Sequence, residues 1–392
     1  MRSPPARHES NATPHAPSAS WPTVADAGEP RPLAAARWDW SAVRRVLVVR
    51  LRSIGDTVLA TPSLRALRRY LPQARVDILL EDWVAPLVEG SADVDRVVTV
   101  KRRSNRSRFE AARELRAAEY DVAFNLHGGS TAALLMRASG AKHRVGYRDY
   151  AYASLHNHLA PPSAELWGTE KTHSAEQQLA LLGYAGVPVT DRPATRLFVN
   201  ERASEVVSAK LRGAGLEEGE PFALMHPAAA FDSKTWAAEN FARVADHLAA
   251  PGLRVVAVAS PEESGVIDEV RRLARRTPPI GFTDLLLPEV AALASRAVLF
   301  VGNDSGVAHI AAAFAVPSVV VFGSSNVAHW RPWTTAPSEV VREEMPCAPC
   351  PGYTCAEFGE AQCIRRVTVE RVVEAVGRVT AAAGLAFDEA RA

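Results

Sequence analysis

Residues 46–72 read VLVVRLRSIGDTVLATPSLRALRRYLP, and this stretch decides the fold class. The β-branched, apolar run 46–51 predicts a buried strand, which the short polar loop 52–56 follows. Leucines spaced three and four residues apart then predict a helix over 64–71, and a second apolar run occupies 76–80. A strand, a helix and another strand in this order are typical of a parallel sheet covered by helices.

The same alternation continues along the chain in two series. Strands are predicted at 46–51, 76–80, 97–100, 122–126, 222–225, 255–258, 297–301 and 318–322. Turn formers and charges between 186 and 220 separate the two series. We therefore expect an α/β fold with two Rossmann-like, doubly wound domains facing across a cleft. The expected ranges are a disordered N-terminal extension over 1–40, domains over 41–200 and 201–378, and a C-terminal tail over 379–392.

The composition is that of an ordinary globular protein, with 47% apolar and 23% charged residues among 392. The 45 basic and 44 acidic residues leave a net charge of +1, which gives no global attraction to nucleic acid. No apolar run reaches the ~18 residues that a membrane-spanning helix needs. The N-terminus lacks the apolar core of a signal peptide and is rich in Pro and Ser. These features predict a cytoplasmic protein.

Polar loops follow several of the predicted strands, where doubly wound sheets bind their ligands. Asp56 ends the first loop and is either a helix cap or a carboxylate that accepts a proton from a hydroxyl nucleophile. Lys234 is either a solvated lysine or a phosphate contact beside a helix N-terminus. The loop 302–309, GNDSGVAH, is either a capping sequence or a phosphate- or sugar-binding turn. His127, in a fourth loop, is more typical of a structural histidine.

Three separated motifs now indicate a family. Residues 46–72, the HP…DSKTW segment within 226–236 and FVGNDSGVAHIAAAF at 300–314 resemble the ADP-heptose:lipopolysaccharide heptosyltransferases, glycosyltransferase family nine. The resemblance spans roughly residues 44–378. It implies the GT-B fold, with the acceptor bound mainly by the first domain and the sugar nucleotide by the second. It also implies inversion of the anomeric centre with no catalytic metal.

The resemblance also implies roles for single residues. Asp56 would be the general base, and Lys234 would neutralise the leaving diphosphate. Asp304 would hold the hydroxyls of the donor sugar, and Glu263, or its neighbour Glu262, would bind the ribose. The expected donor-binding residues are His226, Lys234, Glu263, Asp304, Ser305, Gly306 and His309.

A basic segment over 101–108 carries five positive charges in eight residues. By itself it is a solvated loop or a nucleic-acid contact, and the lack of interleaved aromatic residues counts against single-stranded nucleic acid. The resemblance implies that this region meets a phosphorylated, carboxylated, lipid-linked glycan. It also fits peripheral contact with the anionic cytoplasmic face of the inner membrane. The candidate acceptor-binding residues are Arg65, Arg69, Arg102, Arg103 and Arg106.

All four cysteines lie in one segment, at Cys347, Cys350, Cys355 and Cys363. Disulfides are uncommon in a reducing cytoplasm, and a cluster opening with C-x-x-C is typical of a structural zinc or iron site. The spacings differ from those of a standard zinc ribbon. Similar clusters occur in some branches of the family, including relatives that modify proteins.

The motifs together predict transfer of heptose from ADP-heptose to a lipopolysaccharide inner-core acceptor. One alternative is a family relative that glycosylates a protein or another glycan. The other is a nucleotide-binding protein without catalysis, against which Asp56 and Lys234 argue. A dinucleotide-dependent oxidoreductase fits poorly, because no G-x-G-x-x-G fingerprint follows the first strand of either domain.

Overall fold

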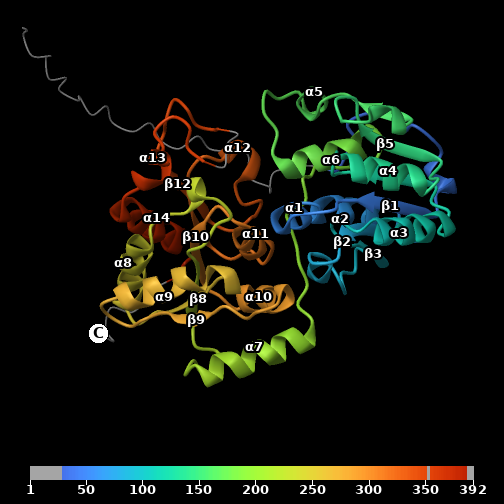
Figure 1. Cartoon of the computed structure of the whole chain (residues 1–392). Helices are drawn as coiled ribbons and strands as arrows, with labels where there is room; N and C mark the ends of the chain where they lie inside the picture. Colours follow the sequence, from blue (N-terminus) through green and yellow to red (C-terminus); the bar gives the residue numbers. More distant parts are fainter. Residues whose placement is uncertain (1–28, 351–353, 386–392) are drawn as a thin grey trace, which may run out of the picture.

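The computed structural model describes residues 29–350 and 354–385, which form two parallel six-stranded sheets (Figure 1). The first sheet has the strand order β3-β2-β1-β4-β5-β6, and the second has the order β12-β11-β10-β7-β8-β9. In each sheet the order in which strands are added reverses between two central strands, β1 and β4 in the first sheet and β7 and β10 in the second. Such a switch point creates the crevice where doubly wound sheets bind ligands. The expected α/β architecture of two Rossmann-like units is confirmed.

The first sheet is formed by the N-terminal half. Its strands are β1 (Arg45–Val49), β2 (Arg75–Glu81), β3 (Arg96–Val100), β4 (Val122–Asn125), β5 (His143–Tyr147) and β6 (His158–Ala160). Its helices are α1 (Ile54–Val58), α2 (Thr61–Tyr70), α3 (Asn105–Ala117), α4 (Ser130–Ala138), α5 (Ser163–Trp167) and α6 (Ser174–Tyr184).

The second sheet is formed by the C-terminal half. Its strands are β7 (Phe222–His226), β8 (Arg254–Val258), β9 (Ile280–Phe282), β10 (Leu299–Asn303), β11 (Ser318–Phe322) and β12 (Ser338–Arg342). Its helices are α7 (Glu201–Gly213), α8 (Ala238–Ala249), α9 (Ser264–Leu273), α10 (Leu287–Ala294), α11 (Gly306–Ala313), α12 (Val327–Trp330), α13 (Gln362–Arg365) and α14 (Val369–Ala382). Short 3-10 turns, η4 (Asp232–Lys234) and η5 (Pro261–Glu263), follow β7 and β8.

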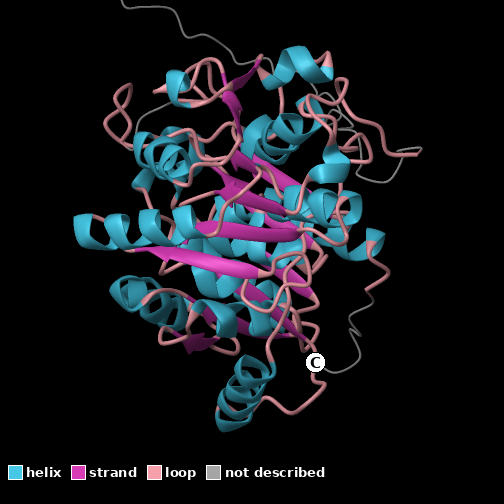
Figure 2. Cartoon of the chain, turned by 90° about the vertical axis from the view of Figure 1, so that its right-hand side faces the viewer, coloured by secondary structure: helices cyan, strands magenta, loops and turns pink. Residues whose placement is uncertain are grey.

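Strand β1 shows how the alternating strand geometry builds both faces of a core. Val46 and Val48 pack against leucines of α2 and α6, whereas Leu47 and Val49 pack against α3 and α4. Successive side chains of a strand point to opposite faces, so an apolar run without alternation requires cover on both sides. Figure 2 shows the strands in the interior with helices on either side.

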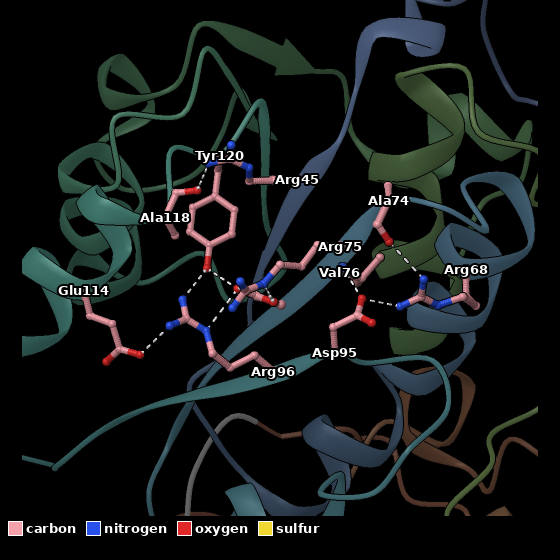
Figure 3. Close-up of polar contacts among 11 residues, drawn as sticks. Arg45, Arg68, Ala74, Arg75, Val76, Asp95, Arg96, Glu114, Ala118 and Tyr120 are labelled. Carbon is pink, nitrogen blue, oxygen red and sulfur yellow. Dashed lines mark hydrogen bonds and ion pairs between the residues drawn. The ribbon is translucent and has the colours of Figure 1, made fainter.

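A buried polar network ties the amino ends of β2 and β3 together, away from the loops that could bind ligands (Figure 3). The Asp77 carboxylate is fully buried and accepts a hydrogen bond of 2.6 Å from the Tyr120 hydroxyl. Arg75 and Arg96 pair with the same carboxylate, and Arg96 also pairs with Glu114 at 2.8 Å. Burial and the Asp77 charge raise the pKa of Tyr120. Because every member is paired, the network is structural.

The prediction of disorder is wrong for residues 31–40. Arg31 donates its N–H to the Thr190 hydroxyl at 2.8 Å, and the Trp40 indole donates to the Ala185 carbonyl at 2.9 Å. Trp38 stacks on His143 with their ring centroids 4.4 Å apart. Two tryptophans among Pro and Ala therefore supply enough apolar surface to hold this segment on the first half. Residues 1–28 of the predicted extension lie outside the described residues.

The chain ends differ from prediction in one more respect. Helix α14 continues to Ala382, beyond the expected end of the second domain at residue 378. Val379 and Thr380 lie on the buried face of this helix, so they belong to the packed domain and not to a tail. Composition alone does not distinguish the two cases. Residues 386–392 lie outside the described residues, and the division of the domains at residue 200 stays a prediction. Among the described residues, none of the helices is both long and apolar enough to cross a membrane.

Candidate functional site

The first turns of α1 and α11, one from each half, touch one another (Figure 1). A Cβ atom on Gly55 would lie 2.7 Å from the His309 ring, and one on Gly306 would lie 2.7 Å from Ile54. Both glycines therefore permit an approach that any larger residue would block. This contact brings the loop of Asp56 to the loop 302–309.

The structure confirms the cap: Asp56 lies in the first turn of α1 and closes it. Its carboxylate accepts the Ser53 backbone N–H at 3.2 Å and the Ser53 hydroxyl at 3.1 Å, which caps α1. It also forms an ion pair with the Arg50 guanidinium, and the side chains of Asp56 and Arg50 are 18% and 10% exposed. A carboxylate has about four lone-pair positions. With three of these positions used by Ser53 and Arg50, the same carboxylate also lines a pocket.

That pocket has a volume of about 280 Å³ and lies between the two halves. Asp56, Tyr150 and Gln178 line it from the first half, and His329 and Trp330 of α12 line it from the second. We call it the Asp56 pocket.

The two walls of the Asp56 pocket are joined by hydrogen bonds between the halves. His173 caps α6 by accepting the Ala175 N–H at 3.1 Å, and its Nε2 bonds the Arg331 carbonyl at 2.8 Å. Behind it, the Thr195 hydroxyl donates to the Trp333 carbonyl at 2.7 Å. Burial lowers the pKa of His173, so a neutral imidazole makes the hydrogen bond to the Arg331 carbonyl at pH 7.

On the side of the second sheet, Lys234 and Asp304 form an ion pair of 2.9 Å between Nζ and Oδ2. Their side chains are 25% and 6% exposed, and the Ser325 hydroxyl also donates to Asp304 Oδ2 at 2.5 Å. The fully buried Asn303 fixes the loops around this pair, because its amide donates to the Pro227 carbonyl and accepts the Trp236 N–H. The loops after β7, β10 and β11 thus form one unit.

Buried imidazoles lie beside this unit. Burial lowers the pKa of His309, and the charges of Asp304, Asp56 and Lys234 act on the same ring. His309 therefore lies between the predicted base and the predicted donor residues. Burial lowers the pKa of His226 to about 4, opposed by the carboxylate of Glu263. Both imidazoles are neutral at pH 7, and in neither does Nδ1 have a hydrogen-bond partner among the described residues.

The remaining expected donor residues are also at this end of the sheet. Ser305 precedes the first turn of α11 at Gly306, and its buried hydroxyl has no hydrogen-bond partner among the described residues. Glu263 lies in η5 after the neighbouring strand β8 and accepts the Ser260 N–H at 3.3 Å. The structure thus gathers all seven expected donor residues at the carboxyl ends of adjacent strands.

A second pocket, of about 300 Å³, adjoins the Asp56 pocket and shares His127 with it. Five basic side chains line it, together with the first turn of α4. We call it the basic pocket, and its cations are Arg52, Lys101, Arg102, Arg103 and Arg108. Two of the predicted acceptor residues, Arg102 and Arg103, therefore line a pocket that adjoins the Asp56 pocket. Such a concentration of positive charge suits a phosphate or carboxylate.

Three other predicted acceptor residues are not among the residues that line either pocket. Arg106 is 89% exposed and pairs with Glu110 one turn along α3, at 2.8 Å. Arg69 binds both oxygens of Asp191 through two guanidinium nitrogens, at 2.5 and 3.0 Å. Arg65 lies on the same helix α2, and its positive charge acts on the carboxylate of Asp93. Spacing along the sequence indicates the Arg106–Glu110 pair, four residues apart on a helix, but not the pairing of Arg69 with Asp191.

The four cysteines gather but form no disulfide. Cys363 is buried in α13, and burial together with the other three thiols raises its pKa. The Cys350 N–H donates to the Ser324 carbonyl at 3.1 Å, which attaches the segment to the loop after β11. Four thiolates match the ligand type and number of a zinc or iron site. Within 29–350 and 354–385, however, no three side chains are already placed to hold an ion.

Comparison with known proteins decides the family. The profile of glycosyltransferase family 9 (heptosyltransferase) matches residues 108–359, well over half of the chain. This chain belongs to glycosyltransferase family 9. Lipopolysaccharide heptosyltransferase 3 of Escherichia coli K12 is 28% identical over 300 residues, which cover 72% of this chain and 84% of that protein.

Solved structures of other family 9 proteins agree in fold. The family 9 glycosyltransferase from Veillonella parvula has a TM-score of 0.78 at 22% identity, covering 88% of this chain and 99% of that one. The Escherichia coli ADP-heptose lps heptosyltransferase II has a TM-score of 0.71 at 22% identity, covering 87% and 99%. The predicted GT-B fold is thereby confirmed, and the family profile together with the curated relative confirms the predicted glycosyltransferase activity. The matched profile includes Lys234 and Asp304 but begins after Asp56.

Sequence reasoning missed several residues of the site. Arg50 is the ion-pair partner of Asp56, Ser325 is a partner of Asp304, and Gln178 lines the Asp56 pocket. Arg50 directly follows β1 and lies only six residues before Asp56, so the sequence placed the two side chains near each other. Gln178 and Ser325 lie in segments with no motif, and only the folded chain brings them to the site.

Proposed function

We propose that this family 9 enzyme transfers heptose from ADP-heptose to a lipopolysaccharide inner-core sugar, with Asp56 as the general base. The observation that carries the proposal is the position of Asp56. Its carboxylate lines the pocket between the halves, with the basic pocket on one side and the Lys234–Asp304 pair beyond His309 on the other. The names of the relatives, a lipopolysaccharide heptosyltransferase and an ADP-heptose lps heptosyltransferase, support the substrates.

The chemistry follows from this arrangement. Asp56 accepts the proton of the acceptor hydroxyl as its oxygen attacks the anomeric carbon of the donor sugar. The bond from that carbon to the β-phosphate oxygen breaks, ADP leaves, and the configuration inverts. Arg50 and Ser53 hold the carboxylate in one orientation during this step.

The second half stabilises the leaving group. Lys234, released from Asp304, neutralises the growing charge on the diphosphate, and backbone N–H groups at the first turn of α11 bind its oxygens. Asp304 then accepts hydroxyls of the donor sugar. Positive groups held in place before the reaction stabilise the transition state without a metal ion.

A nucleotide panel tests the donor. We expect ADP and ADP-heptose to raise the Tm of the full chain, and UDP, GDP and UDP-glucose to leave it unchanged. A ligand at 100 times its Kd stabilises the folded protein by about 2.7 kcal/mol, which a thermal scan resolves. Stabilisation by UDP or GDP alone would contradict the ADP assignment.

The basic pocket is proposed to bind an anionic group of the lipid-linked acceptor. The basic pocket adjoins the Asp56 pocket through His127, so a phosphate or carboxylate bound there would hold a neighbouring sugar in reach of the base. The same basic surface is proposed to rest on anionic lipid at the cytoplasmic face of the inner membrane, where each basic residue adds about 1 kcal/mol.

Replacing Arg102 and Arg103 with Gln tests the pocket. We expect the acceptor KM to rise about tenfold or more with little change in the donor KM, because only acceptor binding loses charge. The difference from wild type should shrink at high salt, since salt screens these charges. Arg106→Gln, which removes an exposed arginine outside the pocket, is the matched control. Equal effects in both variants would show that the basic pocket is not the acceptor site.

The four cysteines are proposed to hold a structural zinc or iron ion. Cys347, Cys350, Cys355 and Cys363 would be its ligands, and the ion would fix the segment that Cys350 attaches to the loop after β11. The ion would act on the fold and on the adjacent donor loop, at a distance from the reacting atoms.

Metal analysis of the purified full chain tests this site. We expect close to one zinc or iron per chain, and loss of the metal with a lower Tm in Cys363→Ser, since ligand loss uncouples metal binding from folding. The exposed Cys347→Ser variant should show a smaller fall in Tm. A metal-free wild type with the same Tm before and after chelation would contradict the proposal.

A further inference from the structure

The side chain of Gln178 is the feature of the Asp56 pocket that the proposed mechanism does not use. It is 2% exposed and lies on α6, in the wall of the pocket. Neither its amide nitrogen nor its amide oxygen has a hydrogen-bond partner among the described residues. Its neighbour Gln177, by contrast, reaches His329 at 3.5 Å.

A buried amide without partners is costly to a folded protein. Burying a donor or acceptor without a hydrogen bond is unfavourable, and the large majority of buried side-chain polar atoms in proteins are paired. A methionine or leucine would fill the same space on α6 without that cost. An unpaired amide that faces a pocket is therefore best explained by a ligand that pairs with it.

The rest of the wall indicates what kind of ligand this is. Tyr150 and Trp330 add a phenol and an indole ring, which commonly pack against sugar rings. Burial and the charges of Arg50 and Arg52 lower the pKa of His127 to about 4, so its imidazole is neutral at pH 7. His127 Nδ1 also has no partner among the described residues. Neutral donors and acceptors beside aromatic rings suit hydroxyl groups, whereas the adjoining basic pocket suits anions.

We infer that the Asp56 pocket holds the acceptor sugar ring that carries the reacting hydroxyl, and that Gln178 selects it. The Gln178 amide can donate a hydrogen bond to one hydroxyl of the ring and accept a hydrogen bond from another. Asp56, which lines the same pocket, accepts a hydrogen bond from a third hydroxyl, the one that reacts. The anionic group of the same acceptor then occupies the basic pocket, and His127 lies where the two pockets meet. This assignment rests on the proposed function.

Gln178→Met tests the inference, because methionine has a similar length and no polar atoms. Titration of the wild-type full chain with delipidated inner-core oligosaccharide should show binding, and binding to Gln178→Met should be about tenfold weaker. Binding of ADP should stay unchanged. Without its unpaired amide, the variant should melt at a Tm equal to or about 2–4 °C above that of wild type. The exposed Gln73→Met variant is the matched control and should behave as wild type.

The outcomes separate this inference from the proposed function. Unchanged oligosaccharide binding in Gln178→Met, or no binding to wild type, would overturn the pocket assignment. A lower Tm together with weaker binding would also overturn it, because it would show that the amide supports the fold. If binding weakens as expected but wild type does not turn over ADP-heptose, the sugar site stands and the proposed donor is wrong.

Discussion

Asp56→Asn should reduce heptosyl transfer by about 10²- to 10⁴-fold, the range that a general base contributes. Asparagine keeps the shape of the side chain and can still accept the Ser53 N–H, so α1 should keep its cap. It cannot accept the hydroxyl proton. The Kd for ADP, measured from the thermal stabilisation that ADP causes, should stay within twofold of the wild-type value. The reason is that the proposed contact of Asp56 is with the acceptor and not with the nucleotide. Single-turnover rates with saturating donor and acceptor measure the loss.

A carboxylate-to-amide change in another capping box provides the control. Glu289 caps α10 by accepting the Leu286 N–H at 2.9 Å and lies outside both pockets. Glu289→Gln should therefore leave the rate of transfer at the wild-type value. If Asp56→Asn retains more than a tenth of wild-type turnover, Asp56 is not the base. The Tm of each variant separates lost chemistry from lost folding, since Asp56→Asn also removes the charge partner of Arg50.

Lys234→Met should weaken ADP-heptose binding and lower kcat by about 10²- to 10³-fold, as expected when one group that stabilises transition-state charge is removed. It should also lower the Tm, because the Asp304 carboxylate is 6% exposed and would lose its cation. Donor titrations and initial rates measure the two functional effects.

Two further variants separate function from folding at this position. Lys234→Met combined with Asp304→Asn removes both charges, so the Tm should recover while transfer stays low. Lys210→Met breaks another lysine–aspartate pair of the same half, 2.6 Å from Asp284, and should leave donor binding intact. Recovery of activity together with stability in the double variant would show that Lys234 only supports the fold.

The architecture was predictable because the central strands are apolar on both faces. All eight predicted strands are present, with ends shifted by at most two residues. The missed strands are β5, β6, β9 and β12. β6 and β9 have only three residues each, and β5 and β12 carry charged or polar residues among their apolar ones. Whether such short or outer strands form depends on their pairing with a neighbouring strand, and the hydrophobic periodicity of the sequence does not reveal that pairing.

The candidate site was predictable only in part. Lys234 and the loop 302–309 follow strands of the second sheet, so the topology alone brings them to one edge, whereas Asp56 follows a strand of the first sheet and reaches them through the contact of α1 with α11. The charge of Arg69 on α2 suggests an anion contact, but its acidic partner Asp191 lies more than a hundred residues away and is not visible in the sequence. Gln178 could not be recognised either, because its significance lies in an unpaired buried amide.

The central claim is heptosyl transfer between ADP-heptose and a lipopolysaccharide core. The most direct measurement incubates the full chain with ADP-heptose and lipopolysaccharides truncated at successive inner-core sugars, without added divalent cation. Mass spectrometry of the glycan and quantification of ADP then follow the reaction. The account predicts that one truncated form gains a single heptose, with one ADP released per heptose. ADP-heptose left intact with every acceptor, or ADP released without heptose on the glycan, would contradict it.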